Sequence, residues 1–183
     1  MKVRSLSIPD ILLIEPKVFM DDRGFFFESF NQADFEKRTN LSPIIVQENH
    51  SKSIKGTLRG LHYQLPPKAQ DKLLRVVKGE IFDVVVDIRK SSSTFGKWVG
   101  ETLSEKNKKQ IWIPKGFAHG FLALSEIADL IYQTTDYYAP QYEYCIRWDD
   151  PKLNIDWNLQ GVNLLLSTKD KQGALIQNSK VFD

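Results

Sequence analysis

Cysteine is almost missing from this sequence: Cys145 is the only one among 183 residues. A single cysteine cannot form an intrachain disulfide, which excludes a disulfide-stapled secreted scaffold and favours a reducing compartment. Long apolar runs are missing too, since the N-terminal region reaches only Ile11 to Ile14. A signal peptide needs about 7–15 apolar residues and a membrane helix about 20. We therefore expect a cytoplasmic protein without a membrane partner.

The sequence also lacks an excess of either charge, with 25 Lys and Arg against 23 Asp and Glu. Nucleic-acid-binding proteins usually carry a dominant basic surface, so no nucleic-acid partner is expected. Phosphate-binding glycine loops and the Gly-x-Ser-x-Gly nucleophile motif do not occur, which leaves cofactor-dependent redox chemistry without support. No repeat or linker divides the chain, and one domain over residues 1–183 is predicted.

What the sequence does contain is period-two alternation, which indicates β-strands. Residues 72–89 resemble a hairpin that turns at Lys78 and Gly79, and Phe82, Val84 and Val86 should share one face of its second strand. Further strands are predicted over residues 57–64, 97–103, 110–113, 117–124, 130–138 and 144–148. Many short strands predict an all-β fold, a jelly-roll or cupin-like barrel or sandwich.

Helical signal is scarce, so we expect only a few short peripheral helices. Residues 31–38 predict one helix capped by Asn31. Ser167 to Asp170 resembles a capping box, with Ser at the cap and an acid three residues later.

Two polar residues interrupt the strand over residues 57–64. In a regular pleat Arg59 and His62 point to opposite sides. Gly60, between them, is a residue type that tolerates a bulge. If both side chains serve one pocket, the sequence predicts a bulge or bend near Gly60.

Other polar residues allow two interpretations each. His119 lies between Phe117 and Phe121 on one strand face. It is either a ligand contact or a buried core histidine. Lys72 opens a strand, opposite in face to Arg75, and is either solvated or functional. Tyr132 is either a packing residue or an acid.

A metal site is not expected. The usual ligand set of small metal-binding β-barrels needs a His-x-His pair and a nearby Glu, and here the stretch is His62-Tyr63-Gln64. His50 and His119 do not form a facial pair with it by spacing. This argues against a metal-dependent dioxygenase.

Several motifs, in order over residues 8–157, make the sequence resemble the dTDP-4-dehydrorhamnose 3,5-epimerases, which are cofactor-independent nucleotide-sugar epimerases. Beyond Trp157 the resemblance rests mainly on Ser167 to Asp170. The matching segments are Phe19 to Glu28, Gln47 to Ser51, Leu58 to Gln64, Ala69 to Leu73, Asp83 to Arg89, Thr94 to Gly96, Trp112 to Phe121 and Trp148 to Pro151.

This resemblance implies a metal-free jelly-roll homodimer and a role for each matching residue. It implies that His62 is the base and Tyr132 the acid, that Asp170 pairs with His62, and that Lys72 faces the developing enolate. It also implies a set of nucleotide-sugar contacts, of which Arg23 and Glu28 act across the dimer interface: Arg23, Glu28, Gln47, Asn49, Arg59, His119, Glu143 and Lys169.

The implied chemistry suits these side chains. A 4-keto sugar acidifies its C3 and C5 hydrogens because the carbanion delocalises onto the ketone oxygen, so no cofactor is needed. The enzyme must supply a base, a cation or donor at that oxygen, and an acid on the other face. Imidazoles are largely neutral at pH 7, which suits His62 as base. Asp170 could instead serve only as a helix cap, and Asp83 is a competing partner for His62.

The expected reaction is therefore epimerisation at C3 and C5 of dTDP-4-dehydro-6-deoxy-D-glucose (the dTDP-4-keto-6-deoxyglucose substrate), which gives dTDP-4-dehydro-L-rhamnose for dTDP-L-rhamnose biosynthesis. One alternative is an epimerase of another deoxysugar pathway that acts at one carbon only. The other is a sugar-binding barrel without catalytic activity.

Overall fold

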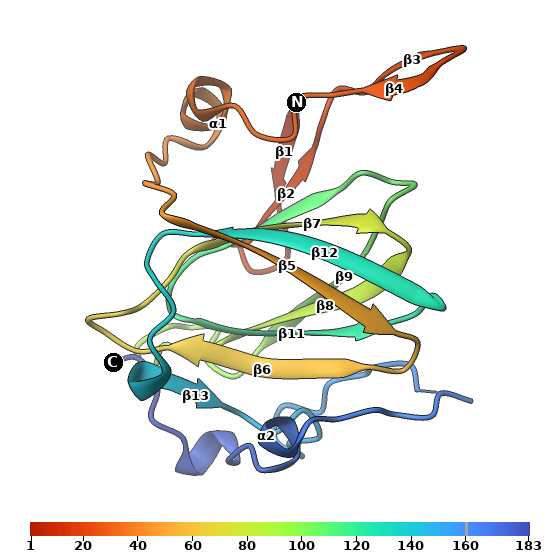
Figure 1. Ribbon diagram of the computed structural model, residues 1–183. Helices are drawn as coiled ribbons and strands as arrows, with labels where there is room; N and C mark the ends of the chain where they lie inside the picture. Colours follow the sequence, from red (N-terminus) through yellow and green to blue (C-terminus); the bar gives the residue numbers. More distant parts are fainter. Residues whose placement is uncertain (160) are drawn as a thin grey trace.

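The alternating segments of the sequence form two antiparallel sheets that face one another as a sandwich (Figure 1). The computed structural model describes residues 1–159 and 161–183. The six-stranded sheet has the order β1 (Lys2–Ser5), β2 (Leu12–Glu15), β10 (Gln110–Ile113), β7 (Lys72–Lys78), β12 (Ile127–Thr134), β5 (Gln47–Ile54). The five-stranded sheet has the order β13 (Glu143–Cys145), β6 (Leu58–Gln64), β11 (Phe117–Ala123), β8 (Glu80–Asp87), β9 (Trp98–Ser104).

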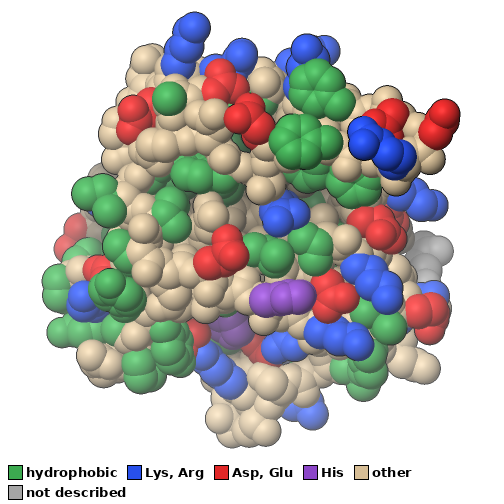
Figure 2. Space-filling view, turned by 45° about the horizontal axis from the view of Figure 1, so that its top comes forward, with side chains coloured by type: hydrophobic (Ala, Val, Ile, Leu, Met, Phe, Trp, Pro, Cys, Tyr) green, Lys and Arg blue, Asp and Glu red, His purple; other side chains and the backbone are tan. Residues whose placement is uncertain are grey.

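Two strands stand apart from the sandwich. β3 (Phe19–Asp21) and β4 (Gly24–Phe26) pair with each other as a hairpin that projects from the body of the molecule (Figure 1). The hairpin exposes apolar side chains, among them Met20 at 72% and Phe26 at 66% of their surface. Figure 2 shows hydrophobic side chains gathered near this hairpin, with acidic and basic side chains between them.

Helices are few and peripheral, as predicted. α1 (Gln32–Thr39) begins at Asn31, whose side chain accepts a hydrogen bond from the backbone of Asp34. α2 (Thr168–Lys171) has Ser167 as its cap, and two 3₁₀ turns cover Pro140–Tyr142 and Ile176–Asn178. Among the described residues, no helix is both long and apolar enough to cross a membrane.

The apolar faces of the strands explain the layers. Between the sheets lies a core that includes Leu74, Leu130, Val85 and Phe121. The outer face of the five-stranded sheet packs its other residues, such as Val84 and Val86, against the C-terminal segment. β8 is therefore buried on both faces, and its predicted alternation is confirmed.

The predicted hairpin over residues 72–89 is wrong. β7 and β8 are strands, but they belong to different sheets, and their neighbours are β10 and β12 for β7 and β11 and β9 for β8. Gly79 alone separates them, with a φ of 75°, and a Cβ there would lie 2.0 Å from the carbonyl oxygen of Ile127. Because β7 and β8 pair with other strands in different sheets, the chain turns a corner at Gly79 rather than forming a hairpin.

The predicted irregularity near Gly60 is confirmed. His119 on β11 lies opposite His62, whereas Phe121 lies opposite Arg59, so two steps on β11 match three on β6. This count is that of a β-bulge. Gly60 has a φ of 129°, and a Cβ there would lie 2.5 Å from the Cα of Gly120. Glycine is therefore required at this close crossing of two strands.

Candidate functional site

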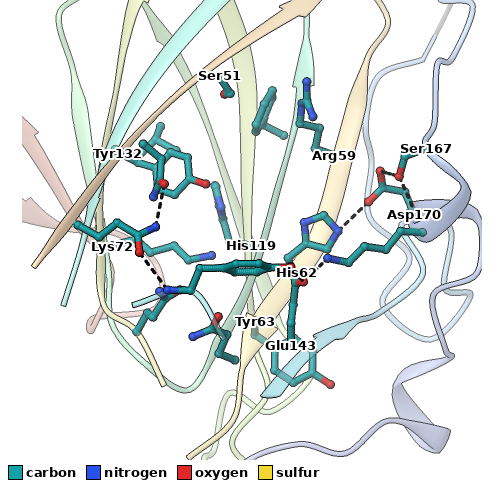
Figure 3. Close-up of a pocket in the computed structure, with 18 residues that line it drawn as sticks. Ser51, Arg59, His62, Tyr63, Lys72, His119, Tyr132, Glu143, Ser167 and Asp170 are labelled. Carbon is teal, nitrogen blue, oxygen red and sulfur yellow. Dashed lines mark hydrogen bonds and ion pairs between the residues drawn. The ribbon is translucent and has the colours of Figure 1, made fainter. Parts of the chain in front are cut away.

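A cavity of about 490 Å³ opens between the two sheets and is lined mostly by polar side chains (Figure 3). This volume is in the usual range for small-molecule sites. Ten of the predicted site residues line it: Gln47, Asn49, Arg59, His62, Lys72, His119, Tyr132, Glu143, Lys169 and Asp170.

His62 comes from β6 and lies beside Asp170 of α2. Its Nε2 is 2.7 Å from Oδ1 of Asp170, which is ion-pair distance, although the ring is not aligned for a hydrogen bond of standard geometry. Since Nε2 faces the carboxylate, Nδ1 is the nitrogen left to take a proton. The bulge at Gly60 brings His62 and Arg59 to the same cavity.

Asp170 is buried and held from several directions. It accepts hydrogen bonds from the hydroxyl of Ser167 at 2.6 Å and from the backbone N–H of Gly60 at 3.1 Å. Burial opposes its charge, but His62, Ser167 and Gly60 outweigh this and lower the pKa of Asp170 to about 2. Because Ser167 also caps α2 by accepting from the N–H of Asp170, the capping motif and the pairing with His62 coexist.

Asp83 has a different partner. Its Oδ2 lies 2.8 Å from Nε2 of His119, and both side chains are buried. Of the two partners that the sequence left open for His62, the structure therefore places Asp170 beside it. His119 is at once a core residue with a satisfied ring nitrogen and a residue that lines the cavity.

Lys72 lines the cavity from the first position of β7. Burial lowers the pKa of Lys72 to about 8, and the acids Glu143 and Asp83 oppose this shift. Arg75, three residues along, lines a separate small pocket on the other face, as the alternation predicts. A buried cation of this kind can stabilise negative charge that develops during a reaction.

Tyr132 lines the cavity from β12, the neighbour of β7. Figure 3 shows its ring across the cavity from His62, on the other sheet. Burial, with Glu143 nearby, raises the pKa of Tyr132, while Arg59 lowers it. The phenol therefore keeps its proton at neutral pH and is available as a donor.

Two further groups line the cavity with polar atoms. Lys169 forms an ion pair with Glu143, which also accepts a hydrogen bond from the hydroxyl of Tyr138 at 2.7 Å. The amide of Gln47 donates to Asn49 at 2.8 Å. These two amides offer the donors and acceptors that a nucleobase requires.

Arg59 points into the cavity with its charge available. Its Nε donates to the hydroxyl of Ser53 at 3.1 Å, and one terminal nitrogen donates to the carbonyl of Lys52 at 3.1 Å. Both acceptors are neutral, so neither offsets the positive charge. Guanidinium groups of this kind bind phosphate oxygens well.

Arg23 and Glu28 do not line the cavity of their own chain. Arg23 lies at the tip of the β3–β4 hairpin, 2.6 Å from Asp21, with 90% of its side chain exposed. Glu28 accepts a hydrogen bond from Asn31 at 3.0 Å. Arg23 belongs to the projecting hairpin, whereas Glu28 follows it and lies near Ile14 and Leu73 of the sandwich.

Some lining residues were not among the sequence-based candidates. Ser51 follows Gln47 and Asn49 on the same face of β5, so period-two alternation was an available signal for it. Leu74 and Phe121 alternate with Lys72 and His119 on β7 and β11, so the same signal was available for them. The others come from the end of β6 and from connections whose side-chain directions the sequence does not reveal. The unpredicted lining residues are Ser51, Tyr63, Gln64, Gln70, Leu74, Phe121, Tyr138 and Ser167.

Potential metal donors also occur at this site. His62, Cys145 and Asp170 each offer one ligand atom, and these atoms lie within 4.8 Å of one another. Cys145 is a free, partly buried cysteine. Burial, with Asp170 nearby, raises the pKa of its thiol to about 12.

Comparisons with known proteins agree with this architecture. The family model described as dTDP-4-dehydrorhamnose 3,5-epimerase matches residues 5–178. The chain is 57% identical over 182 residues to the dTDP-4-dehydrorhamnose 3,5-epimerase of Pseudomonas aeruginosa, covering 100% of this chain and 99% of that one.

Two solved structures extend the comparison. A Legionella pneumophila dTDP-6-deoxy-D-glucose-3,5-epimerase in complex with dTDP-4-keto-L-rhamnose has a TM-score of 0.94 and 49% identity, covering 98% of this chain and 94% of that one. A 3'-monoepimerase from Streptomyces bikiniensis in complex with dTDP-quinovose has a TM-score of 0.90 and 32% identity, covering 95% and 87%. This cupin-like sandwich therefore belongs to the dTDP-4-dehydrorhamnose 3,5-epimerase family.

Proposed function

We propose that residues 1–183 form one epimerase domain that converts dTDP-4-dehydro-6-deoxy-D-glucose to dTDP-4-dehydro-L-rhamnose, in dTDP-L-rhamnose biosynthesis. The observation that carries the proposal is the placement of the ionised Asp170 2.7 Å from Nε2 of His62, at a cavity whose opposite wall holds Tyr132. This is the arrangement of a base and an acid on two faces of one bound ring.

In the proposed first step, Nδ1 of His62 takes the proton from C3 or C5. The electrons of the broken C–H bond move onto the C4 ketone oxygen, and an enolate forms. The carboxylate of Asp170 stabilises the imidazolium, and the ammonium of Lys72 stabilises the enolate oxygen. Neither the step nor its reversal requires an external oxidant or reductant.

In the second step, the hydroxyl of Tyr132 gives a proton to the opposite face of the same carbon. The carbonyl re-forms, and the configuration at that carbon is inverted. Tyr132 regains a proton from solvent, and His62 releases the one that it took. Arg59 is proposed to bind the diphosphate, and the amides of Gln47 and Asn49 to contact the nucleotide.

The test is to incubate the enzyme with dTDP-4-keto-6-deoxyglucose in deuterium oxide and to follow C3 and C5 by NMR. We expect deuterium at both carbons and formation of the L-rhamno product. Exchange at one carbon would point to a monoepimerase, the second candidate, to which the similarity of the S. bikiniensis enzyme lends support. Tight binding without exchange at either carbon would show a sugar-binding protein instead.

The projecting hairpin supports a second part of the proposal, a homodimer. Phe19, Met20, Phe25 and Phe26 are each at least half exposed, and Arg23 lies among them. Exposed apolar side chains in this number are typical of an interface. We infer that the hairpin packs on a partner subunit, and that Arg23 and Glu28 reach the partner's cavity.

Mixed dimers test this arrangement. Differently tagged chains carrying Arg23→Ala or His62→Ala are coexpressed, and the heterodimer is purified by both tags. If Arg23 acts across the interface, one site of the heterodimer keeps both residues, and about half of the wild-type activity is expected from a two-fold dimer. Each mutant homodimer should have far less. A heterodimer no more active than the homodimers would mean that Arg23 acts within its own chain.

A further inference from the structure

Behind the His62 ring lies a group of three side chains that the proposed reaction uses only in part. Cys145 on β13 is directly opposite His62 in the strand register, and Asp170 approaches from α2. The ring nitrogen, the thiol sulfur and a carboxylate oxygen lie within 4.8 Å of one another. A nitrogen, a sulfur and an oxygen donor together form a ligand set that zinc accepts.

One of these donors is poorly satisfied by the protein. Nε2 of His62 is buried, and its geometry toward Asp170 is not that of a proper hydrogen bond. The thiol of Cys145 is partly buried and donates a hydrogen bond of 3.6 Å to the carbonyl of Ile146, which a metal would replace. Unsatisfied buried polar atoms of this kind are uncommon in folded proteins, and a bound ion is one of the explanations for them.

The third donor is already oriented. Ser167 and Gly60 fix the carboxylate of Asp170 with hydrogen bonds, which is the support that metal-binding carboxylates usually have from surrounding residues. Zinc–ligand bonds of about 2.0–2.3 Å place tetrahedral donors roughly 3.5 Å apart. The His62 and Asp170 atoms are 2.7 Å apart and the Cys145 sulfur lies within 4.8 Å of them, so small movements of all three side chains are needed, with the ring and the carboxylate moving apart.

We propose that His62, Cys145 and Asp170 form an inhibitory site for soft divalent cations of the Zn²⁺ and Cd²⁺ class. The ion binds Nε2 of His62, Sγ of Cys145 and one oxygen of Asp170, and a water completes the coordination. The thiol proton is released to solvent. The proton of a neutral ring moves from Nε2 to Nδ1, since Nε2 now donates its electron pair to the metal.

Metal binding therefore removes the catalytic base but does not prevent substrate binding. With its proton on Nδ1, His62 has no electron pair left with which to attack a C–H bond. The ion sits on the Asp170 side of the ring, so Arg59, Gln47 and Asn49 stay free to bind nucleotide. This part of the inference rests on the proposed role of His62, whereas the binding of the ion does not.

The experiment uses the intact protein and Cd²⁺ as the probe. Wild-type protein should show an ultraviolet thiolate-to-cadmium charge-transfer band, and should lose solvent deuterium exchange over the same range of Cd²⁺ concentration. The dissociation constant for dTDP should change less than about threefold over that range, because the nucleotide contacts are elsewhere. Zn²⁺ should inhibit in the same way.

Cys145→Ala and Cys145→Ser are the matched variants, since Cys145 does not line the cavity. Both should keep wild-type activity without metal, lack the charge-transfer band, and need at least about ten times more Cd²⁺ for inhibition. His50→Ala, which removes an exposed histidine on β5, should respond as the wild type does.

Equal sensitivity of both Cys145 variants and the wild type would overturn the proposal, as would a weakening of dTDP binding in parallel with inhibition. A charge-transfer band without inhibition would remove the inhibitory role. Failure of the proposed function is distinguishable, since an inactive metal-free enzyme would still show the band if the ion binds here.

Discussion

His62→Ala is expected to lower deuterium exchange at both C3 and C5 by about 10⁴-fold, at the upper end of what a general base contributes. Both carbons are next to the same ketone, and one imidazole beside Asp170 is placed to serve both of them. Once the imidazole is removed, solvent water is not a comparable base in the same position. The measurement is single-turnover exchange in deuterium oxide, followed by NMR.

The matched control is His50→Ala, which also removes a histidine but from an exposed position on β5, 3.6 Å from Asp129. It should exchange both carbons at the wild-type rate. The folded state of His62→Ala is checked by circular dichroism and by its affinity for dTDP, neither of which should change much. Exchange within about tenfold of wild type in folded His62→Ala would rule out His62 as the base.

Lys72→Met is expected to reduce kcat by about 10²–10³-fold, the usual cost of removing one stabiliser of a developing oxyanion. Methionine keeps much of the length of the side chain but removes its charge, so the enolate oxygen loses its cationic partner. KM should change far less than kcat, since the ketone carries little charge before the proton is removed. Steady-state kinetics separates the two.

The pH dependence of the wild-type enzyme provides a second test of the role of Lys72. Burial lowers the pKa of Lys72 to about 8. Below that pH the amine is protonated and can stabilise the enolate, and above it the charge is lost. We expect kcat/KM to fall by about tenfold per pH unit well above pH 8, and this decline should be missing from Lys72→Met.

Lys78→Met is the matched control, because Lys78 ends the same strand and is exposed. It should leave both kcat and the alkaline pH profile unchanged. A Lys72→Met enzyme with near-normal kcat, or one that keeps the alkaline decline, would exclude Lys72 as the cation at the enolate.

Alternation was enough to predict most of the buried strands, because burial on one or both faces selects apolar residues at regular spacing. β5 was not predicted as a strand, because its apolar signal is weak. Its sequence, Gln47 to Ile54, is polar on both faces, since one face is largely exposed and the other lines a cavity that requires polar groups. In this fold, the strand with the weakest apolar signal is one of those that build the site.

Strand pairing was predicted less well than strand existence. The segments on either side of Gly79 were expected to pair, and they lie in different sheets. Local sequence specifies that the chain turns there, but the choice between a hairpin and a corner depends on which distant strands compete for pairing. β10 and β12 occupy both edges of β7, and no local pattern contains that information.

Some features of the site could be predicted from the sequence, and others could not. The glycine between Arg59 and His62 predicted the bulge, because two polar side chains three positions apart can share a pocket only with an extra residue. The choice between Asp83 and Asp170 as partner of His62 was not decidable by spacing, since it depends on how the C-terminal segment folds back over β6. The proximity of Cys145 to His62 was not predicted, because it is set by the register of β13 on β6.

The base and the acid are carried by different sheets, His62 by the five-stranded one and Tyr132 by the six-stranded one. Their separation is therefore set by side chains between the layers, such as Leu74 and Phe121, which also line the cavity. Replacing these apolar residues by larger or smaller ones would alter the distance between the base and the acid on either side of a bound sugar ring. Attempts to engineer which carbon is inverted could thus begin in the hydrophobic interior, with the reactive groups left untouched.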